Sequence, residues 1–210
     1  MTDRATEHVT AIATLVAGAL PDSHLDDLLI AGEYAGLRWT RGSGTGLSLL
    51  RFEGGVLVQS WNAARDPSAG SWPDDGANEH VVEAAVERAG TGAGAIRATL
   101  ERYFAIRADV SRADQLREMF SEPMVVHGPG PTRVENLDEF VARVKSEKDA
   151  IPRLTFRADD VLHSGNRSLL RWSYLKGDSV AAAGLTLYAF HEGVVVERWQ
   201  TSMPEGAGWV

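Results

Sequence analysis

Apolar residues recur at helical spacing before each of two longer, strand-like regions of the chain. One helix is predicted before Pro21, and another between Asn136 and Pro152, where Asn136 and Glu139 form a capping box. The pattern predicts a further helix around Leu100 and a shorter one around Leu116. The apolar faces of the four are Val9, Ile12, Leu15, Val16 and Leu20; Leu137, Phe140, Val141 and Val144; Ile96, Leu100, Tyr103 and Phe104; and Leu116, Met119 and Phe120.

Runs of β-branched and aromatic residues, separated by glycine-containing turns, predict strands after these helices. Four strands are expected over residues 154–162, 168–175, 181–190 and 194–200. Connections this short join neighbouring strands in an antiparallel meander. The fold class expected from the whole pattern is α+β.

The strand regions are two copies of one motif, covering residues 26–62 and 159–200. In both copies an aspartate precedes an Arg-Trp pair by 12 residues, and a phenylalanine precedes a second tryptophan by nine. Only the middle differs, where the second copy is five residues longer. The matching positions are Asp26 and Asp159, Gly32 and Gly165, Arg38 and Arg171, Trp39 and Trp172, Phe52 and Phe190, Gly55 and Gly193, and Trp61 and Trp199. Such agreement predicts a duplicated module.

The two copies divide the chain into unequal parts. We assign residues 1–66 to a first module with one helix and a meander, and residues 95–210 to a second module with the full set of helices. Residues 67–94 form a linker rich in Pro, Gly and Asp that contains a predicted helix over 79–89. Because the first module has fewer helices, we expect that linker helix to cover its sheet, with Val82 and Val86 facing the sheet.

Composition and charge restrict the function. The 210 residues include no cysteine, which excludes disulfides and thiolate chemistry, and the net charge of −8 disfavours nucleic acid and anionic membrane as partners. The six histidines have no metal-ligand spacing, so we expect neither a metal nor another cofactor. The polar N-terminus does not resemble a signal peptide, which favours the cytoplasm.

Three motifs in the second module carry a resemblance to a known family. They are His127-Gly-Pro-Gly-Pro before a helix, Arg171-Trp172-Ser173 on a strand, and Phe190, Gly193 and Trp199-Gln200 at the end. In this order they resemble the nuclear transport factor 2-like superfamily, and within it the SnoaL-like polyketide cyclase branch. The resemblance covers about residues 95–203, and about 6–66 as a copy that lacks two helices. It implies a cone-shaped curved antiparallel sheet wrapped around helices, duplicated here with the first copy incomplete.

The resemblance also implies an apolar pocket and residues that would line it. Arg171 and Ser173 share one face of a strand with Leu169, and in the family that face lines the pocket; the alternative is a solvent-facing arginine. Arg171 would anchor or polarise a substrate oxygen. Tyr103 and Phe104 are expected to contribute from the first helix of the module, although Tyr103 could equally be an ordinary buried tyrosine.

Gln200 stands where cyclases and epoxide hydrolases of this group carry a catalytic aspartate. An amide cannot transfer a proton at neutral pH, but it can orient a substrate. His127 could replace the missing base, or it could simply cap a turn. The candidate catalytic residues are therefore Arg171, Gln200 and His127, and the candidate substrate-binding residues are Tyr103, Phe104, Leu169 and Ser173.

Two functions remain open from the sequence. One is a cyclase, isomerase or epoxide-opening enzyme of secondary metabolism, acting on a hydrophobic polyketide-like molecule. The other is a non-catalytic ligand-binding or accessory protein with the same fold. In either case we expect the two modules to pack sheet against sheet as a pseudo-dimer within one chain, and a homodimer of the whole chain remains an option.

Overall fold

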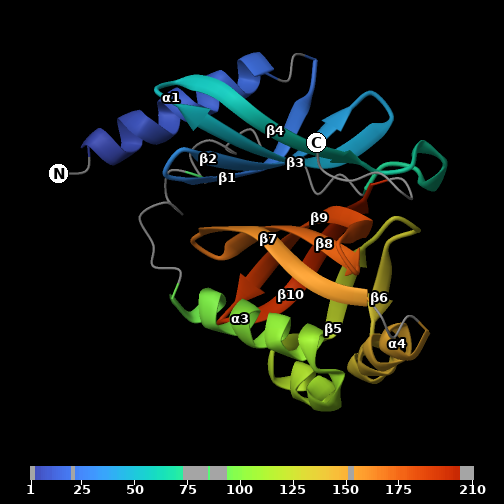
Figure 1. Cartoon of the computed structure of the whole chain (residues 1–210). Helices are drawn as coiled ribbons and strands as arrows, with labels where there is room; N and C mark the ends of the chain where they lie inside the picture. Colours follow the sequence, from blue (N-terminus) through green and yellow to red (C-terminus); the bar gives the residue numbers. More distant parts are fainter. Residues whose placement is uncertain (1–2, 20–21, 73–84, 86–93, 151–153, 204–210) are drawn as a thin grey trace.

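The structure is a computed structural model that describes residues 3–19, 22–72, 85, 94–150 and 154–203. Within these ranges two sheets lie face to face in the middle of the molecule, with α1 outside one sheet and α3 and α4 outside the other (Figure 1). The first module comprises α1 (Asp3–Ala19), β1 (His24–Ala31), β2 (Tyr34–Arg41), β3 (Gly44–Glu53), β4 (Val56–Ala64) and the short helix η1 (Pro67–Ala69). The second comprises α3 (Gly94–Ala108), η2 (Val110–Glu118), β5 (Phe120–His127), β6 (Arg133–Glu135), α4 (Leu137–Ala150), β7 (Leu154–Ser164), β8 (Arg167–Lys176), β9 (Ser179–His191) and β10 (Val194–Ser202).

Each sheet contains a four-stranded antiparallel meander, and the second sheet has an addition. The first sheet has the order β1-β2-β3-β4, and the second has the order β6-β5-β10-β9-β8-β7 within the described ranges. Strand β5 pairs parallel to β10, with Trp199 opposite His127, and β6 pairs antiparallel to β5. The α+β class and the expected meanders are confirmed.

The predicted helices match the structure with one exception. At the start of α4 the Asn136 side chain accepts a hydrogen bond from the backbone N–H of Glu139 at 2.8 Å, as the capping box predicts. The short helix expected to include Phe120 is wrong in its extent: η2 is a 3-10 helix that begins after Asp109, and Phe120 begins β5. The apolar run from Leu116 to Phe120 crosses the boundary between these two elements, so its spacing misled the prediction.

Matching details in the two sheets support the duplication. Gly46 lies against Trp39, and Gly184 lies against Trp172. A Cβ added at either glycine would lie 2.4 Å from the tryptophan ring. Trp39 donates through Nε1 to Ser48 at 2.9 Å, and Trp172 donates to Thr186 at 3.0 Å. The ladder shifts by one residue at Asp26 in β1 and at Asp159 in β7, the two aspartates that match in the sequence.

A hydrophobic core fills the space between the sheets. Its fully buried members come from both modules and include Leu29, Leu47, Leu49, Leu169, Leu185, Leu187 and Trp199. Two arginines cross this interface reciprocally: the Arg38 guanidinium lies 4.7 Å from the Trp199 ring, and that of Arg171 lies 4.5 Å from the Trp61 ring. The matching arginines of the repeat thus each contact the matching tryptophan of the other copy.

The outer face of the first sheet is covered mainly by α1. Val9, Ile12 and Val16 pack there on Leu28, Ile30 and Leu37. The linker helix expected over 79–89, including Val82 and Val86, lies outside the described residues apart from Ala85. That residue is helical, fully buried and part of the same cluster.

Candidate functional site

A cavity of about 290 Å³ lies between the second sheet and the helices that cover it. Its walls come from α3, α4 and strands β7 to β10. Aromatic side chains supply much of the surface: Tyr103, Phe156, Trp172, Tyr174 and Tyr188. The polar lining residues are Arg107, Arg143, Thr186, Arg198 and Gln200. A mostly apolar pocket with few polar groups is typical of small-molecule sites.

The face of β8 that lines the cavity is opposite to the one predicted. Leu170, Trp172 and Tyr174 line it, whereas Leu169 belongs to the core between the sheets. The predicted placement of Leu169, Arg171 and Ser173 on the cavity floor is therefore wrong. The physical reason is that both faces of β8 are buried, one by helices and one by the first module, so hydrophobic alternation does not distinguish them.

Arg171 is held at the interface between the modules. Its guanidinium contacts the carboxylate of Asp160 at 2.5 Å and lies over the ring of Trp61. Ser173, on the same face, donates to Asp159 at 2.5 Å. These contacts give Arg171 and Ser173 a structural role in joining strands and modules, and they leave both side chains away from the cavity.

His127 also lies on the interface face of the sheet. Its ring stacks on Trp199 with 5.1 Å between centroids, Nε2 lies 2.6 Å from Glu197, and Nδ1 lies 2.9 Å from Thr132. Both ring nitrogens thus have protein partners, and His127 is not among the described residues that line the cavity. The predicted rim position is wrong, and the base function suggested for His127 has no geometric support.

Gln200 and Tyr103 do line the cavity, and Phe104 borders it only indirectly. Gln200 pairs across the sheet with Thr186, and Thr186 pairs with Leu170, so all three share the cavity face. Arg171 pairs with Leu185 on the other face. The predicted set therefore combined residues from opposite faces. Phe104 packs against Phe156, with 5.8 Å between the ring centroids, and lines a separate hollow between α3 and β7.

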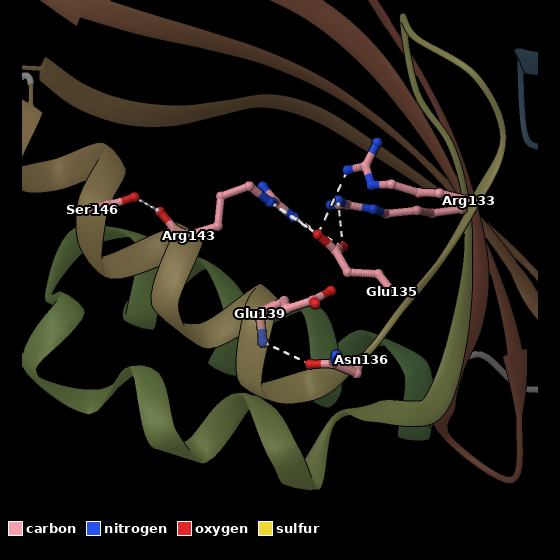
Figure 2. Close-up of polar contacts among 7 residues, drawn as sticks. Arg133, Glu135, Asn136, Glu139, Arg143 and Ser146 are labelled. Carbon is pink, nitrogen blue, oxygen red and sulfur yellow. Dashed lines mark hydrogen bonds and ion pairs between the residues drawn. The ribbon is translucent and has the colours of Figure 1, made fainter.

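Arginines that sequence reasoning missed form the polar end of the cavity. Glu135, buried at the end of β6, receives Arg143 from α4 through two contacts of 3.0 Å (Figure 2). Arg198, on β10, reaches the same carboxylate at 3.4 Å, and Arg133 reaches it at 3.6 Å. One carboxylate is therefore shared by three guanidinium groups.

Arg198 is the most deeply buried of these cations. Its side chain is 5% exposed, and its Nε is buried without a hydrogen-bond partner among the described residues. Burial lowers the pKa of the Arg198 guanidinium, the direction expected for a cation taken out of water. Arginine nevertheless remains charged at neutral pH. The cavity thus contains a positive charge whose hydrogen-bonding capacity is incompletely used.

Two tyrosines lie close to this cation. The rings of Tyr103 and Tyr188 are 6.3 Å apart, and both contribute to the electrostatic environment of Arg198. Burial raises the pKa of Tyr188 well above its ordinary value, and the neighbouring Tyr103 raises it further. Tyr188 therefore keeps its hydroxyl proton at neutral pH and can act as a hydrogen-bond donor.

One sequence feature could have indicated this site. Arg198 and Gln200 are two residues apart on β10, so the position chosen for Gln200 also places Arg198 on the cavity face. The contribution of Arg143 could not be inferred, because it depends on how α4 packs against the second sheet. Among the described lining residues none is Asp, Glu or His. The site can orient a ligand and stabilise negative charge on it, but these residues do not provide a neutral-pH base.

The second module has the antiparallel sheet and covering helices expected from the resemblance to the nuclear transport factor 2-like superfamily. Residues 100–198 match the family model described as SnoaL-like domain, so this part of the chain is a SnoaL-like domain. Among curated proteins none matches the sequence.

Solved structures similar to the chain include two candidate polyketide cyclases and a candidate ketosteroid isomerase. IdmH from Streptomyces antibioticus is 15% identical, covers 51% of this chain and 91% of its own, and has a TM-score of 0.44. The cyclase from Acidithiobacillus ferrooxidans is 16% identical over 52% of this chain and 89% of its own, with a TM-score of 0.45. The isomerase from Kribbella flavida is 14% identical over 55% and 82%, also with a TM-score of 0.45.

Proposed function

We propose that the chain is a cyclase or isomerase that acts on a hydrophobic, ring-containing small molecule in the cavity of the second module. The observation that carries the proposal is the cavity itself, with aromatic walls and with Arg198, Tyr188 and Gln200 gathered on its lining. It lies in the part of the chain that is a SnoaL-like domain. The substrate class, a polyketide-type compound of secondary metabolism, belongs to this proposal.

The lining residues suggest how such a reaction would be accelerated. Trp172, Tyr174 and Phe156 offer flat surfaces that would hold a substrate in a folded conformation, and orientation alone lowers the barrier to an intramolecular reaction. When a carbonyl oxygen gains negative charge, as in enolisation or ring closure, Arg198 and the hydroxyl of Tyr188 would stabilise it. Gln200 would orient the substrate through its amide.

A second candidate function is supported by a specific observation. The described lining residues contain no carboxylate and no histidine, which are the usual proton carriers. A protein that binds the same class of molecule without transforming it, as an accessory to another enzyme, would need only the aromatic walls and the polar contacts. Turnover separates the two functions, because both require the cavity to be occupied.

The experiment that tests the cavity is a comparison of two phenylalanine substitutions on β9. Ala182 lines the cavity, whereas Ser179 on the same strand is exposed. We expect Ala182→Phe to weaken binding of a bicyclic aromatic ketone about tenfold or more, measured by calorimetry, because the added ring occupies the site. Ser179→Phe should bind as the wild type does. Equal affinity in all three proteins would show that the cavity is not the binding site.

A further inference from the structure

We propose that the ligand of this cavity carries a carboxylate group that binds to Arg198. This inference rests on the proposed function, because it names the chemical class of the molecule that the cavity would bind. Three observations support the inference independently of the family. They are the charge balance at the polar end of the cavity, the Arg198 Nε donor without a hydrogen-bond partner among the described residues, and the groups around Arg198.

The charge balance at the polar end favours an anion. The carboxylate of Glu135 contacts Arg143 at 2.9 Å and Arg133 at 3.6 Å (Figure 2). It contacts Arg198 at 3.4 Å. Arg143 has the closest contacts with it, so Arg198 obtains only a long one. Burying a charge without a close partner is costly, and a ligand anion would supply the missing partner. An anion is favoured here even though the chain as a whole has a net charge of −8.

The geometry of Arg198 also suits an anion rather than a neutral group. A guanidinium offers five N–H donors arranged in a plane, and it binds carboxylates through paired hydrogen bonds. In Arg198 the Nε donor is buried and unused among the described residues, while the side chain lines the cavity. The neighbouring Tyr188 stays protonated, so it would donate to the same anion.

The alternative is that Arg198 serves only to hold Glu135. A structural role would make the arginine important for folding but would not make the cavity prefer charged ligands. The two readings therefore differ in ligand selectivity, which can be measured on the unmodified protein.

The test compares 2-naphthoate with 2-naphthamide, two fused-ring probes of nearly the same shape that differ in charge. We expect the wild-type chain to bind naphthoate about tenfold or more tightly than naphthamide at neutral pH and low salt, measured by calorimetry. Arg198→Met should abolish this preference, because it should weaken the binding of naphthoate much more than that of naphthamide. Arg198→Met removes one partner of Glu135 and could disturb the fold. Arg143→Met is therefore a second variant at the same end of the cavity, and it should reduce the preference as well.

The outcomes of this comparison separate the anion site from the proposed function. Equal binding of both probes by the wild type would overturn the anion site and leave the proposed function standing. Failure of both probes to bind would overturn the proposed function, and the anion site with it. A preference for naphthoate that survives in folded Arg198→Met and Arg143→Met would place the anion elsewhere in the molecule.

A different observation, the chemistry of the sheet edges, supports a second inference. Three of the four sheet edges in the described ranges carry charges that discourage pairing with another strand. Strand β1 contains Asp26 and Asp27, β7 contains Arg157 and Asp160, and the three-residue β6 contains two charged residues. Strand β4 differs: its nine residues, Val56 to Ala64, include no charge and no proline.

We infer that β4 pairs with β4 of a second copy of this chain. Val56, Leu57 and Val58 are 63%, 39% and 43% exposed, so the strand presents apolar side chains at an edge with which no described strand pairs. The corresponding edge of β10 is covered by β5, which the first module lacks. An uncharged strand is suited to a copy of itself, because in two-fold pairing residue i faces residue j and j faces i, and no like charges meet within β4, although each chain is acidic.

Analytical ultracentrifugation at increasing concentration tests this interface. We expect the wild type to form a dimer, and the double variant Val56→Lys/Val58→Lys to stay monomeric with an unchanged melting temperature, since both side chains are exposed. Thr155→Lys, at the exposed edge β7, is the matched control and should dimerise normally. A monomeric wild type at about 100 μM, or a dimer that tolerates both lysines, would overturn the inference.

Discussion

At the scale of single residues, Arg171 and Arg198 have different roles: Arg171 joins the two modules, and Arg198 lines the cavity. Arg171 attracts notice in the sequence because it repeats Arg38, but the repeat reflects the packing of two modules. Arg198 has no basic counterpart in the first module, where Ser60 occupies the matching position directly before Trp61. The residue that the duplication does not explain is the one that lines the cavity.

Arg171 should therefore affect stability and not ligand binding. We expect Arg171→Met to lower the free energy of unfolding by about 2 kcal/mol, because it removes both the ion pair with Asp160 and the contact with Trp61. Urea denaturation measures the loss, and Arg38→Met should show a similar one. A large loss of naphthamide affinity in folded Arg171→Met would mean that the cavity site is assigned to the wrong face.

His163 should make stability depend on pH. Burial lowers the pKa of His163, and the nearby Arg97 lowers it further. The unfolded state then binds a proton at a higher pH than the folded state does, so stability falls as the pH drops below about 6.5 and continues to fall until the folded-state pKa is passed. Denaturation of His163→Gln between pH 7.5 and 5 should show a shallower loss. Identical slopes in the two proteins would contradict the stated environment of His163.

At the scale of elements, the sequence was sufficient to predict a helix or strand wherever a single local pattern determined that element. The strands β7 to β10 and the start of α4 follow from alternation, turn glycines and the Asn136 cap. The face of β8 could not be predicted, because Leu169 and Leu170 are both fully buried, one against each layer. Contacts between layers, which local patterns do not contain, decide which of the two lines the cavity.

The glycine in β9 is required by the packing of Trp172. A Cβ at Gly184 would lie 2.3 Å from the carbonyl oxygen of Thr201 and 2.4 Å from the Trp172 ring, so the backbone or the ring would have to move. We expect Gly184→Ala to destabilise the fold by about 1–3 kcal/mol and to weaken binding of naphthamide, since Trp172 lines the cavity. Thermal denaturation and calorimetry measure the two effects. Gly130→Ala, which meets open space, is the control and should change neither.

At the scale of the whole molecule, each module depends on the other. The repeat and the family resemblance predict two related sheets packed against each other, but they do not identify the residues of the shared core, because these residues are far apart in the chain. Leu47 and Leu49 pack with Leu185 and Leu187 across the interface. The Arg38 and Arg171 contacts cross the same surface in opposite directions.

The second module should consequently not remain monomeric and soluble by itself. A chain of residues 94–210 would expose Leu169, Leu185 and Leu187, which are fully buried in the complete protein. We expect it to aggregate or to dimerise through that face, as followed by size-exclusion chromatography with light scattering, because exposed apolar patches of this kind promote association. A stable monomer with the melting temperature of the full chain would contradict a shared core.

The central claim is that the functional site lies on the helix-covered face of the second sheet and ends at Arg198. A crystal structure of the complete chain with bound 2-naphthoate tests it most directly. The account predicts the naphthalene ring against Trp172 and Tyr174, with the carboxylate within hydrogen-bond distance of Arg198. A ligand bound beside Arg171 and His127, on the opposite face of the sheet, would contradict it.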